Sequence, residues 1–466
     1  MKKILIVCSL FSCLRVFGQD APYSTAQLKA DLEFLHAALK KSHPGLYSYS
    51  TKEEIDAQFN SLAAQLPATM SGLEFYEYLT PLCAKIKDGH TLFNPAETVT
   101  AYHNENSRFF PFKIHWDGIK MFVALNYAAT DEIDNGAEIV AINETPAFEI
   151  IEYCLLRMMR DGESPAYPIW VLNNWFNEYY SYFYGHPTEF AIHYRLGKGP
   201  IQTKTIQALS KKSIFENRSK RYPDQAFSRT ADQKEGNGLV LKIDRELKYA
   251  ILTIKDFDNT ILEETYKQPF KKTIEQYFSQ IEAGGVTKLI LDLRNNQGGD
   301  VENGRLLLSW LMNVPFQLVA GYAKVNEPGE TTEAKRNKPC KGPEMGVFQP
   351  KSRAFKGELY VLINGGSFSN SGMVGAALQF YKRGLLIGEE TGGNQHLLCG
   401  NEEILLLPNT RISVAIPTLQ YQIRKADKLS GHGVIPDIVI KPSIRELIKG
   451  GDEILNHALK LVSFGK

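Results

Sequence analysis

The sequence predicts an α/β protein of three parts, and its hydrophobic spacing carries that prediction. In residues 237–466 short apolar runs of strand length alternate with stretches that repeat apolar residues at threes and fours. Strands that alternate with helices form mostly parallel sheets with crossover helices. Residues 107–200 instead hold short runs of alternating apolar and polar residues, which are typical of a small β domain, and residues 22–105 have helical spacing.

The N-terminal part is predicted to be a small helical region over residues 22–105. Its first helix repeats apolar residues every three or four positions, at Leu28, Leu32, Leu35 and Leu39. The Pro44-Gly45 pair ends this helix. Near the end of the region, Asp88-Gly89 marks a tight turn that is followed at once by His90.

The middle part is predicted to be a β domain that binds peptides, followed by a linker. Residues 135–147 combine a glycine turn, a strand and a polar turn, and residues 148–159 have helical spacing. An aromatic run over residues 170–184 is expected to pack against another domain. Residues 201–236 are polar, basic and poor in apolar side chains, so we expect a linker there.

The composition excludes some function classes and indicates export. The chain has 466 residues and a formal charge of +1, which gives no reason to expect a nucleic-acid partner or an anionic membrane surface. Lys2-Lys3, an apolar run over residues 4–14 and a small-residue exit predict a signal peptide over residues 1–18, with a periplasmic or extracellular product. Cleavage before Cys13 with lipid attached there is the alternative. No later stretch has the length and hydropathy of a membrane span.

The cysteines give no metal motif. Apart from two in the predicted signal peptide, they are isolated along the chain, without a Cys-x-x-Cys pair, and no metal site is expected. Export permits disulfides, and the first pairing to consider is Cys340 with Cys399.

The stretch from Val361 to Leu378 is the most informative one in the chain. An apolar run ends at Asn364, glycine and serine crowd the following turn, and helical spacing begins after it. A serine on such a strand-to-helix turn is exposed beside backbone N–H groups that favour negative charge, which is the geometry of a nucleophile. The alternative is that the three serines only cap the helix: Ser367, Ser369 and Ser371.

Two further features could complete a catalytic site. The turn after the predicted strand 288–293 ends in Gly298-Gly299, and paired glycines let a backbone N–H approach a ligand closely. A structural turn explains the same pair. His90 follows another turn, and histidine has an unperturbed pKa of about 6.5, which suits a general base. A lone histidine in a turn is also compatible with a structural role.

Together these features resemble the C-terminal-processing (tail-specific) serine peptidase family. Four of its motifs occur in order: Asp292, Arg294, Asn296, Gly298 and Gly299; Ser367 to Ser371; Gly388, Glu389, Thr391 and Gly393; and Gly433, Val434, Pro436 and Asp437. The resemblance is strongest from about residue 248 to 461. It implies a crotonase/ClpP-like peptidase core, usually with a PDZ-like β domain, and residues 135–146 look like part of such a domain.

The resemblance places the nucleophile at Ser369 and oxyanion donors at the Asn370 N–H and at Gly298 or Gly299. The general-base lysine of the bacterial Ser–Lys members is replaced here by Asn394, whose amide cannot take up a proton at useful pH. The chain then resembles the tricorn-core-like branch, which uses a histidine, and His90 fits that role.

The residue that orients the histidine is less clear from the family pattern. The serine that precedes the histidine in that branch is Gly89 here, and its glutamate aligns with Ser430. We consider Ser430, Asp88 and Glu389 as candidates, in that order, and Thr91 as a further hydroxyl. His432 lies near the same loop and is expected to be a surface residue.

The sequence thus predicts an exported serine peptidase that forms an acyl-enzyme on Ser369 with His90 as general base. No metal or organic cofactor is expected. The PDZ-like part would bind an extended peptide by strand addition and present it to the site. Two alternatives are a catalytically inactive peptide- or lipid-binding protein on the same scaffold and a crotonase-like acyl-CoA enzyme, against which the signal peptide argues.

Overall fold

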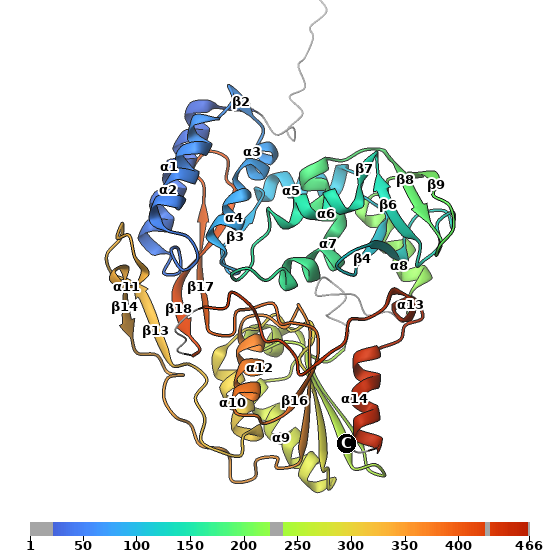
Figure 1. The fold of residues 1–466 in the computed structure, drawn as a ribbon, viewed down its shortest axis with the longest axis vertical. Coiled ribbons are helices and arrows are strands. Elements are labelled where there is room, and N and C mark those ends of the chain that lie inside the picture. Colours follow the sequence, from blue (N-terminus) through green and yellow to red (C-terminus); the bar gives the residue numbers. More distant parts are fainter. Residues whose placement is uncertain (1–21, 224–235, 425–428, 465–466) are drawn as a thin grey trace, which may run out of the picture.

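A computed structural model describes residues 22–223, 236–424 and 429–464 of the chain (Figure 1). The predicted signal peptide, residues 1–18, lies outside the described residues. Within them the chain forms a mixed α/β structure in which three larger sheets are joined by helices. None of the helices in the described ranges combines the length and hydropathy that crossing a membrane requires.

A six-stranded sheet forms the centre of the C-terminal half. Its strand order is β10-β11-β12-β15-β16-β19, and all neighbours are parallel except β10 and β11. The strands are β10 (Leu239–Asp244), β11 (Tyr249–Ile254), β12 (Lys288–Asp292), β15 (Glu358–Ile363), β16 (Leu385–Gly388) and β19 (Ile438–Val439). The helices and one π-helical turn along this part are η2 (Ile261–Thr265), α9 (Phe270–Ala283), α10 (Val301–Leu311), α12 (Asn370–Phe380), α13 (Ile444–Leu447) and α14 (Glu453–Phe464).

Both faces of this sheet are covered by helices, which explains the continuous apolar runs of its strands. Val361 and Ile363 point into a core shared with α9, α10 and α12. Tyr360 and Leu362, which alternate with them, point into a second core formed with α14. Figure 1 shows α14 on the opposite side of the sheet from α9, α10 and α12.

A second sheet brings an N-terminal strand next to the C-terminal half. Its order is β14-β13-β18-β17, and β3 (Leu92–Asn94) pairs antiparallel with β18 through Leu92↔Ala415 and Asn94↔Ser413. Its other elements are β13 (Gly321–Val325), α11 (Glu333–Arg336), β14 (Asn337–Cys340), β17 (Leu397–Leu406) and β18 (Ser413–Gln422). The pairing of β3 with β18 places the turn that carries His90 against the α/β core.

The N-terminal part is helical, as predicted, and short strands are added to it. Its remaining elements are β1 (Tyr23–Ser24), α1 (Thr25–Ser42), α2 (Lys52–Ala64), β2 (Thr69–Met70), α3 (Gly72–Leu79), α4 (Pro81–Ile86) and α5 (Glu97–Asn106). Asp31 of α1 accepts hydrogen bonds from the N–H groups of Asn409 (2.9 Å) and Thr410 (2.8 Å) in the β17–β18 turn. Arg336, fully buried, donates to the carbonyl of Lys40 near the end of α1 (2.8 Å). These contacts fix the helices to the second sheet.

The middle part forms a third sheet of order β4-β5-β6-β8-β9, with β7 beside β6. Its elements are β4 (Phe112–Trp116), β5 (Met121–Asn126), β6 (Glu138–Ile142), β7 (Thr145–Pro146), α6 (Ala147–Leu155), α7 (Ala166–Tyr184), β8 (Glu189–Arg195), β9 (Gln202–Gln207) and α8 (Lys211–Arg221). The linker expected over residues 201–236 is corrected by this sheet, because β9 pairs with β8 and α8 follows it. Most side chains of the edge strand β9 are exposed, which explains its polar sequence. Residues 224–235 lie outside the described residues.

The polar stretch over residues 324–350 contains two short elements, α11 and β14. One further expectation is corrected. The pairing of Cys340 with Cys399 is wrong, since both are free cysteines. Cys340 lies on β14 and Cys399 on β17, and β13 and β18 lie between them. At about 4.8 Å per strand spacing, this separation greatly exceeds the roughly 7 Å that a disulfide allows between Cα atoms.

Arg294 of the family motif has a structural role in joining the turn after β12 to α14. Its guanidinium binds Asp292 (2.7 Å) and Asp452 (2.6 Å), and its side chain is 15% exposed. Replacing Arg294 with Met should lower the free energy of unfolding by about 2–4 kcal/mol, because two partly buried carboxylates lose their partner. Urea unfolding measures this. Arg353→Met is the control, since Arg353 pairs with Glu282 at the surface, and its unfolding midpoint should stay nearly unchanged. Equal midpoint shifts in the two variants would contradict the role given to Arg294.

Candidate active site

Ser369 lies at the turn between β15 and α12, as the sequence predicts. Its backbone has φ 52° and ψ −126°, a conformation that a residue with a side chain rarely adopts. Ser367 and Ser371, on either side, point into the interior, and both hydroxyls donate to the carbonyl of Leu293, at 2.9 and 3.4 Å. The middle serine alone is therefore left at the head of the helix with its hydroxyl outside the core.

His90 meets this serine from the N-terminal part of the chain. The distance from its Nε2 to Ser369 Oγ is 3.1 Å, across 279 positions of sequence. The backbone N–H of His90 donates to Asp88 Oδ1 (2.8 Å), which fixes the turn, and β3 follows directly. The two residues that the sequence suggested as nucleophile and base thus lie within hydrogen-bonding distance.

A stack of aromatic rings supports the imidazole. The His90 ring lies on Phe368 with centroids 4.7 Å apart, and Phe368 lies on Tyr167 at 4.2 Å. Tyr167 in turn stacks on Trp170 at 5.8 Å, and the Trp170 indole N–H donates to Asn295 (2.7 Å). The start of the aromatic helix α7 therefore packs against the serine turn and fixes the plane of the imidazole.

Gly298 and Gly299 lie directly beside the serine turn. A Cβ on Gly298 would lie 2.7 Å from Ser369 Cβ and 2.9 Å from the Asn370 nitrogen, so only glycine fits there. The Gly298 N–H donates to Asn296 Oδ1 (2.8 Å). Within the described residues, the N–H groups of Gly299 and Asn370 make no hydrogen bond. Two free donors thus lie close to Ser369.

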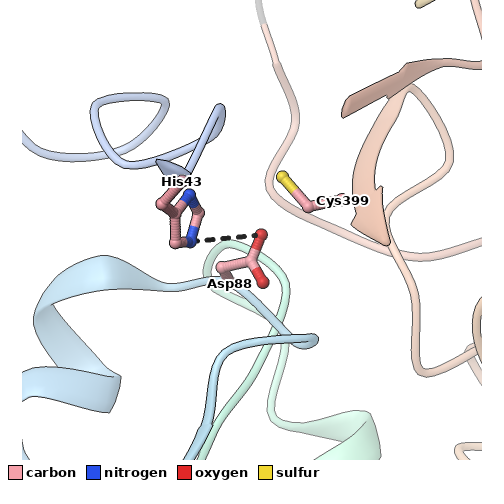
Figure 2. A group of neighbouring side chains, drawn as sticks. All are labelled: His43, Asp88 and Cys399. Atoms are coloured by element: carbon pink, nitrogen blue, oxygen red, sulfur yellow. Dashed lines mark ion pairs between the residues drawn. The ribbon is translucent and has the colours of Figure 1, made fainter. Parts of the chain in front are cut away.

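A buried polar cluster lies behind the histidine turn and joins His43, Asp88 and Cys399 (Figure 2). His43 Nε2 lies 2.7 Å from Thr91 Oγ1 and 3.9 Å from Asp88 Oδ2. Burial lowers the pKa of His43 to about 4, so the ring is neutral near pH 7. Burial also raises the pKa of the Cys399 thiol, which remains protonated beside Asp88.

This cluster contains donor types that zinc takes, since one ligand atom from each of the three side chains lies within 4.8 Å of the others. Thr91 Oγ1 lies within hydrogen-bonding distance of both His43 Nε2 and Asp88 Oδ1, whereas His43 Nδ1 makes no hydrogen bond among the described residues. Burial alone would raise the pKa of Asp88, but His43, His90 and its hydrogen bonds hold it below the ordinary value. Asp88 is therefore an ionised acceptor that ties the histidine turn to its neighbours.

Asp161 is a neighbour of His90 that the sequence reasoning missed. It lies in the loop between α6 and α7, is 3% exposed, and accepts the Gly89 N–H at 2.7 Å. Carboxylate oxygens of Asp88 and Asp161 and a ring nitrogen of His90 lie within 4.8 Å of one another. Asp161 belongs to no regular spacing and no motif, so its only sequence signal is an acid beside Gly162, between two helices.

The other suggested residues lie elsewhere. Ser430 is exposed, and its hydroxyl accepts the His432 N–H (3.2 Å); the structure gives it no hydrogen bond to His90. Glu389 is half-buried, and burial raises its pKa, which Lys441 opposes. His432 is exposed and contacts Glu390 (3.2 Å).

Asn394, at the family's lysine position, donates through its amide to the Tyr49 hydroxyl (2.5 Å). It is almost fully buried. Its backbone N–H points to Asp161 (3.4 Å). The position that holds a general-base lysine in the family pattern is thus occupied here by an asparagine that makes structural hydrogen bonds.

Known proteins resemble this chain in both sequence and fold. A carboxy-terminal-processing protease of Bartonella bacilliformis is 26% identical over 187 residues, which are 40% of this chain and 38% of the relative. A carboxyl-terminal-processing protease of Synechocystis sp. is 28% identical over 198 residues, or 42% of this chain and 41% of the relative. The crystal structure of mature CPAF aligns with a TM-score of 0.67 over 94% of this chain and 97% of that chain, at 14% identity.

The α/β core and these matches define a serine-type peptidase domain. Such a domain is a hydrolase. Residues 248–440 match the model of Peptidase family S41. The resemblance inferred from the four motifs is thereby confirmed. The chain spans about two fifths of the length of the curated relatives it matches, and the likeness to CPAF concerns the fold alone.

Proposed function

We propose that the protein is an exported serine peptidase that hydrolyses peptide bonds through an acyl-enzyme on Ser369, with His90 as general base. The observation that carries the proposal is the 3.1 Å distance between His90 Nε2 and Ser369 Oγ. A base at hydrogen-bonding distance from a hydroxyl at the head of a helix is the arrangement that activates a serine.

In the proposed reaction Ser369 Oγ attacks the carbonyl carbon of the scissile bond while His90 Nε2 takes up the hydroxyl proton. The tetrahedral intermediate collapses, the C–N bond breaks, and His90 returns the proton to the leaving amine. A water molecule, deprotonated by His90, then attacks the ester carbonyl; the C–Oγ bond breaks, His90 returns the proton to Ser369 Oγ, and the acid is released. Atoms and protons balance with no cofactor.

The developing oxyanion needs donors placed before the reaction begins. We assign this role to the Asn370 N–H, at the first turn of α12, and to the Gly298-Gly299 pair. Of the two glycine N–H groups, that of Gly299 is free to donate, because Gly298 already donates to Asn296. The positive end of α12 favours negative charge at the same point.

The substrate class follows from the family: proteins or peptides, bound in extended form. The sheet of the middle part, which we interpret as PDZ-like, has β4 and β9 as its edge strands. An edge strand can accept an extended peptide by strand addition. Of the two edges, part of β4 is occupied, since the Trp116 N–H donates to the Asn173 side chain (2.7 Å).

Labelling with a serine-directed fluorophosphonate tests the assignment. The wild-type protein should form a covalent adduct, detectable by intact-mass spectrometry as one added phosphonyl group, and Ser369→Ala should form none. Ser371→Ala is the matched control, because this neighbouring serine points into the interior, and it should label like the wild type.

Equal labelling of the wild type and Ser369→Ala, or of neither, contradicts the nucleophile. An unlabelled wild type that still binds peptides or lipids would instead favour the inactive binding protein. The replacement of the family's lysine by Asn394 and of its orienting glutamate by Ser430 is what keeps that second candidate in view.

A further inference from the structure

The ring nitrogen of His90 that does not face Ser369 lacks a partner. Nδ1 is buried and makes no hydrogen bond among the described residues. If Nε2 accepts the serine proton, Nδ1 carries the hydrogen of the neutral ring, because only one nitrogen is protonated in that state. A buried N–H without an acceptor is costly, and the positive charge that forms on the ring during the reaction makes an anionic acceptor more valuable still.

Three carboxylates and one further histidine surround His90: Asp88, Asp161, Glu402 and His43. Glu402 Oε1 lies 3.9 Å from Nε2, on the side of the nucleophile, and so faces the wrong nitrogen. His43 is neutral and hydrogen-bonded to Thr91. The choice is therefore between the two aspartates.

Asp88 already accepts hydrogen bonds from other donors. Its Oδ1 accepts the His90 backbone N–H (2.8 Å) and the Thr91 hydroxyl (3.2 Å). Its other oxygen faces His43, as Figure 2 shows, and the Cys399 thiol lies close by. These bonds fix the backbone of the histidine turn and leave Asp88 little capacity for the ring.

Asp161 has capacity to spare. Each of its oxygens accepts one backbone N–H, from Gly89 at 2.7 Å and from Asn394 at 3.4 Å, whereas each carboxylate oxygen can accept two. It also lies close to the serine turn: a Cβ built on Gly393 would lie 3.6 Å from Asp161 Oδ2 and 3.3 Å from the Ser369 nitrogen. A small movement of the Asp161 side chain would therefore bring one of its oxygens to hydrogen-bonding distance from His90 Nδ1.

We propose that Asp161 is the positioning residue that accepts the Nδ1 hydrogen of His90 and stabilises the imidazolium, in the place that Ser430 leaves empty. This inference rests on the proposed function. The loop that carries Asp161 is held in place by two backbone hydrogen bonds: the Gly162 N–H donates to Lys87 O (2.9 Å), and the Glu163 N–H donates to Gly431 O (2.8 Å).

The ionisation of Asp161 agrees with this role. Burial raises its pKa to about 6, with His90 opposing the rise and Asp88 adding to it. The other groups that interact with it are the Tyr49 hydroxyl and the Cys399 thiol, both protonated near pH 7 because burial raises their pKa. At pH 7 and above, Asp161 is therefore mostly an anion, as a partner for an imidazolium must be.

The test is the pH profile of Asp161→Asn. Loss of the carboxylate should lower kcat by about 10²–10⁴-fold, as an Asp→Asn change does in a Ser-His-Asp site. The acid limb of kcat/KM should move to lower pH by roughly one unit, because the imidazolium loses an anionic neighbour and gives up its proton more readily. Glu163→Gln, two positions away in the same loop and exposed, is the control and should leave kcat and the limb unchanged.

A second measurement needs no variant of the aspartate. In wild-type protein labelled with ¹⁵N-histidine, His90 should carry its hydrogen on Nδ1, with a strongly downfield proton resonance that disappears in His90→Gln. Absence of that resonance in the wild type would overturn the proposal.

An unchanged kcat in Asp161→Asn, or a loss of activity in which the acid limb stays in place, would also overturn it. Either result would leave the proposed function intact, provided that the wild type cleaves peptides and is labelled on Ser369. A wild type that neither cleaves peptides nor is labelled on Ser369 would contradict the proposed function itself.

Discussion

Replacing His90 with alanine should lower kcat by about 10⁴–10⁶-fold, the loss that removal of the base causes in a Ser-His-Asp peptidase of another fold. The reason is the 3.1 Å contact between Nε2 and the Ser369 hydroxyl. Among the described residues, the other group that could act as a base on that side is the carboxylate of Glu402, 3.9 Å from Nε2. Hydrolysis of a fluorescently labelled unfolded protein measures the loss, with circular dichroism to confirm that the fold is retained.

The matched control for this prediction is His432→Ala. His432 is an exposed histidine near the 430–433 loop that contacts Glu390, and its replacement should leave kcat within about twofold. The double variant Ser369→Ala/His90→Ala should be no less active than Ser369→Ala alone, since the two groups act as one unit. Wild-type activity in His90→Ala, or additive losses in the double variant, would contradict the base.

The sequence contains the reacting pair but only part of its surroundings. Ser369 could be found because a strand-to-helix turn is a local pattern of apolar run, glycines and helical spacing. His90 could be found because it directly follows a tight turn and because the family pattern includes a histidine. Their meeting depends on β3 pairing with β18, a long-range contact between segments that carry no mutual signal. This pairing is why the distance could be measured only in the structure.

The residue that orients His90 is even harder to predict from the sequence. Ser430 was suggested by alignment to a motif, and it lies exposed in its loop. Asp161 comes to His90 from a loop between two helices. Its carboxylate accepts the Gly89 N–H, and the loop's backbone N–H groups donate to the carbonyls of Lys87 and Gly431. Such an approach leaves no periodicity and no fixed spacing along the chain. The expected linker is wrong for a related reason: most side chains of β9 and α8 are not buried, so their polar composition does not distinguish them from a linker.

Asn394 connects these departures from the family pattern. A lysine there would need room and a nearby anion to lower its cost of burial. The asparagine instead bonds Tyr49 through its side chain and Asp161 through its backbone. In the proposed mechanism the base is therefore His90, in the turn before β3, and Asn394, in the turn after β16, serves only as a hydrogen-bonding partner of Tyr49 and Asp161.

Replacing Gly298 with alanine should lower kcat by about 10²–10³-fold or more, the size of effect expected when a donor to the oxyanion or the nucleophile is displaced. The new Cβ would lie 2.7 Å from Ser369 Cβ, 2.9 Å from the Asn370 nitrogen and 3.0 Å from the Phe368 carbonyl, so the serine turn must shift. The backbone at Gly298 also has φ +101°, where a side chain adds strain of about 1–3 kcal/mol. Steady-state kinetics and urea unfolding measure the two effects separately.

Gly346→Ala separates strain from displacement, because Gly346 has nearly the same φ, +106°, and no atom within 4 Å of the added Cβ. This variant should lose stability by about 1–3 kcal/mol from strain alone and keep the wild-type kcat. Gly298→Ala should lose both stability and kcat, with little labelling of Ser369 by fluorophosphonate. If the two alanine variants have the same kcat, the close approach of Gly298 to the serine turn does not matter for the reaction, and the oxyanion donors must be sought elsewhere around α12.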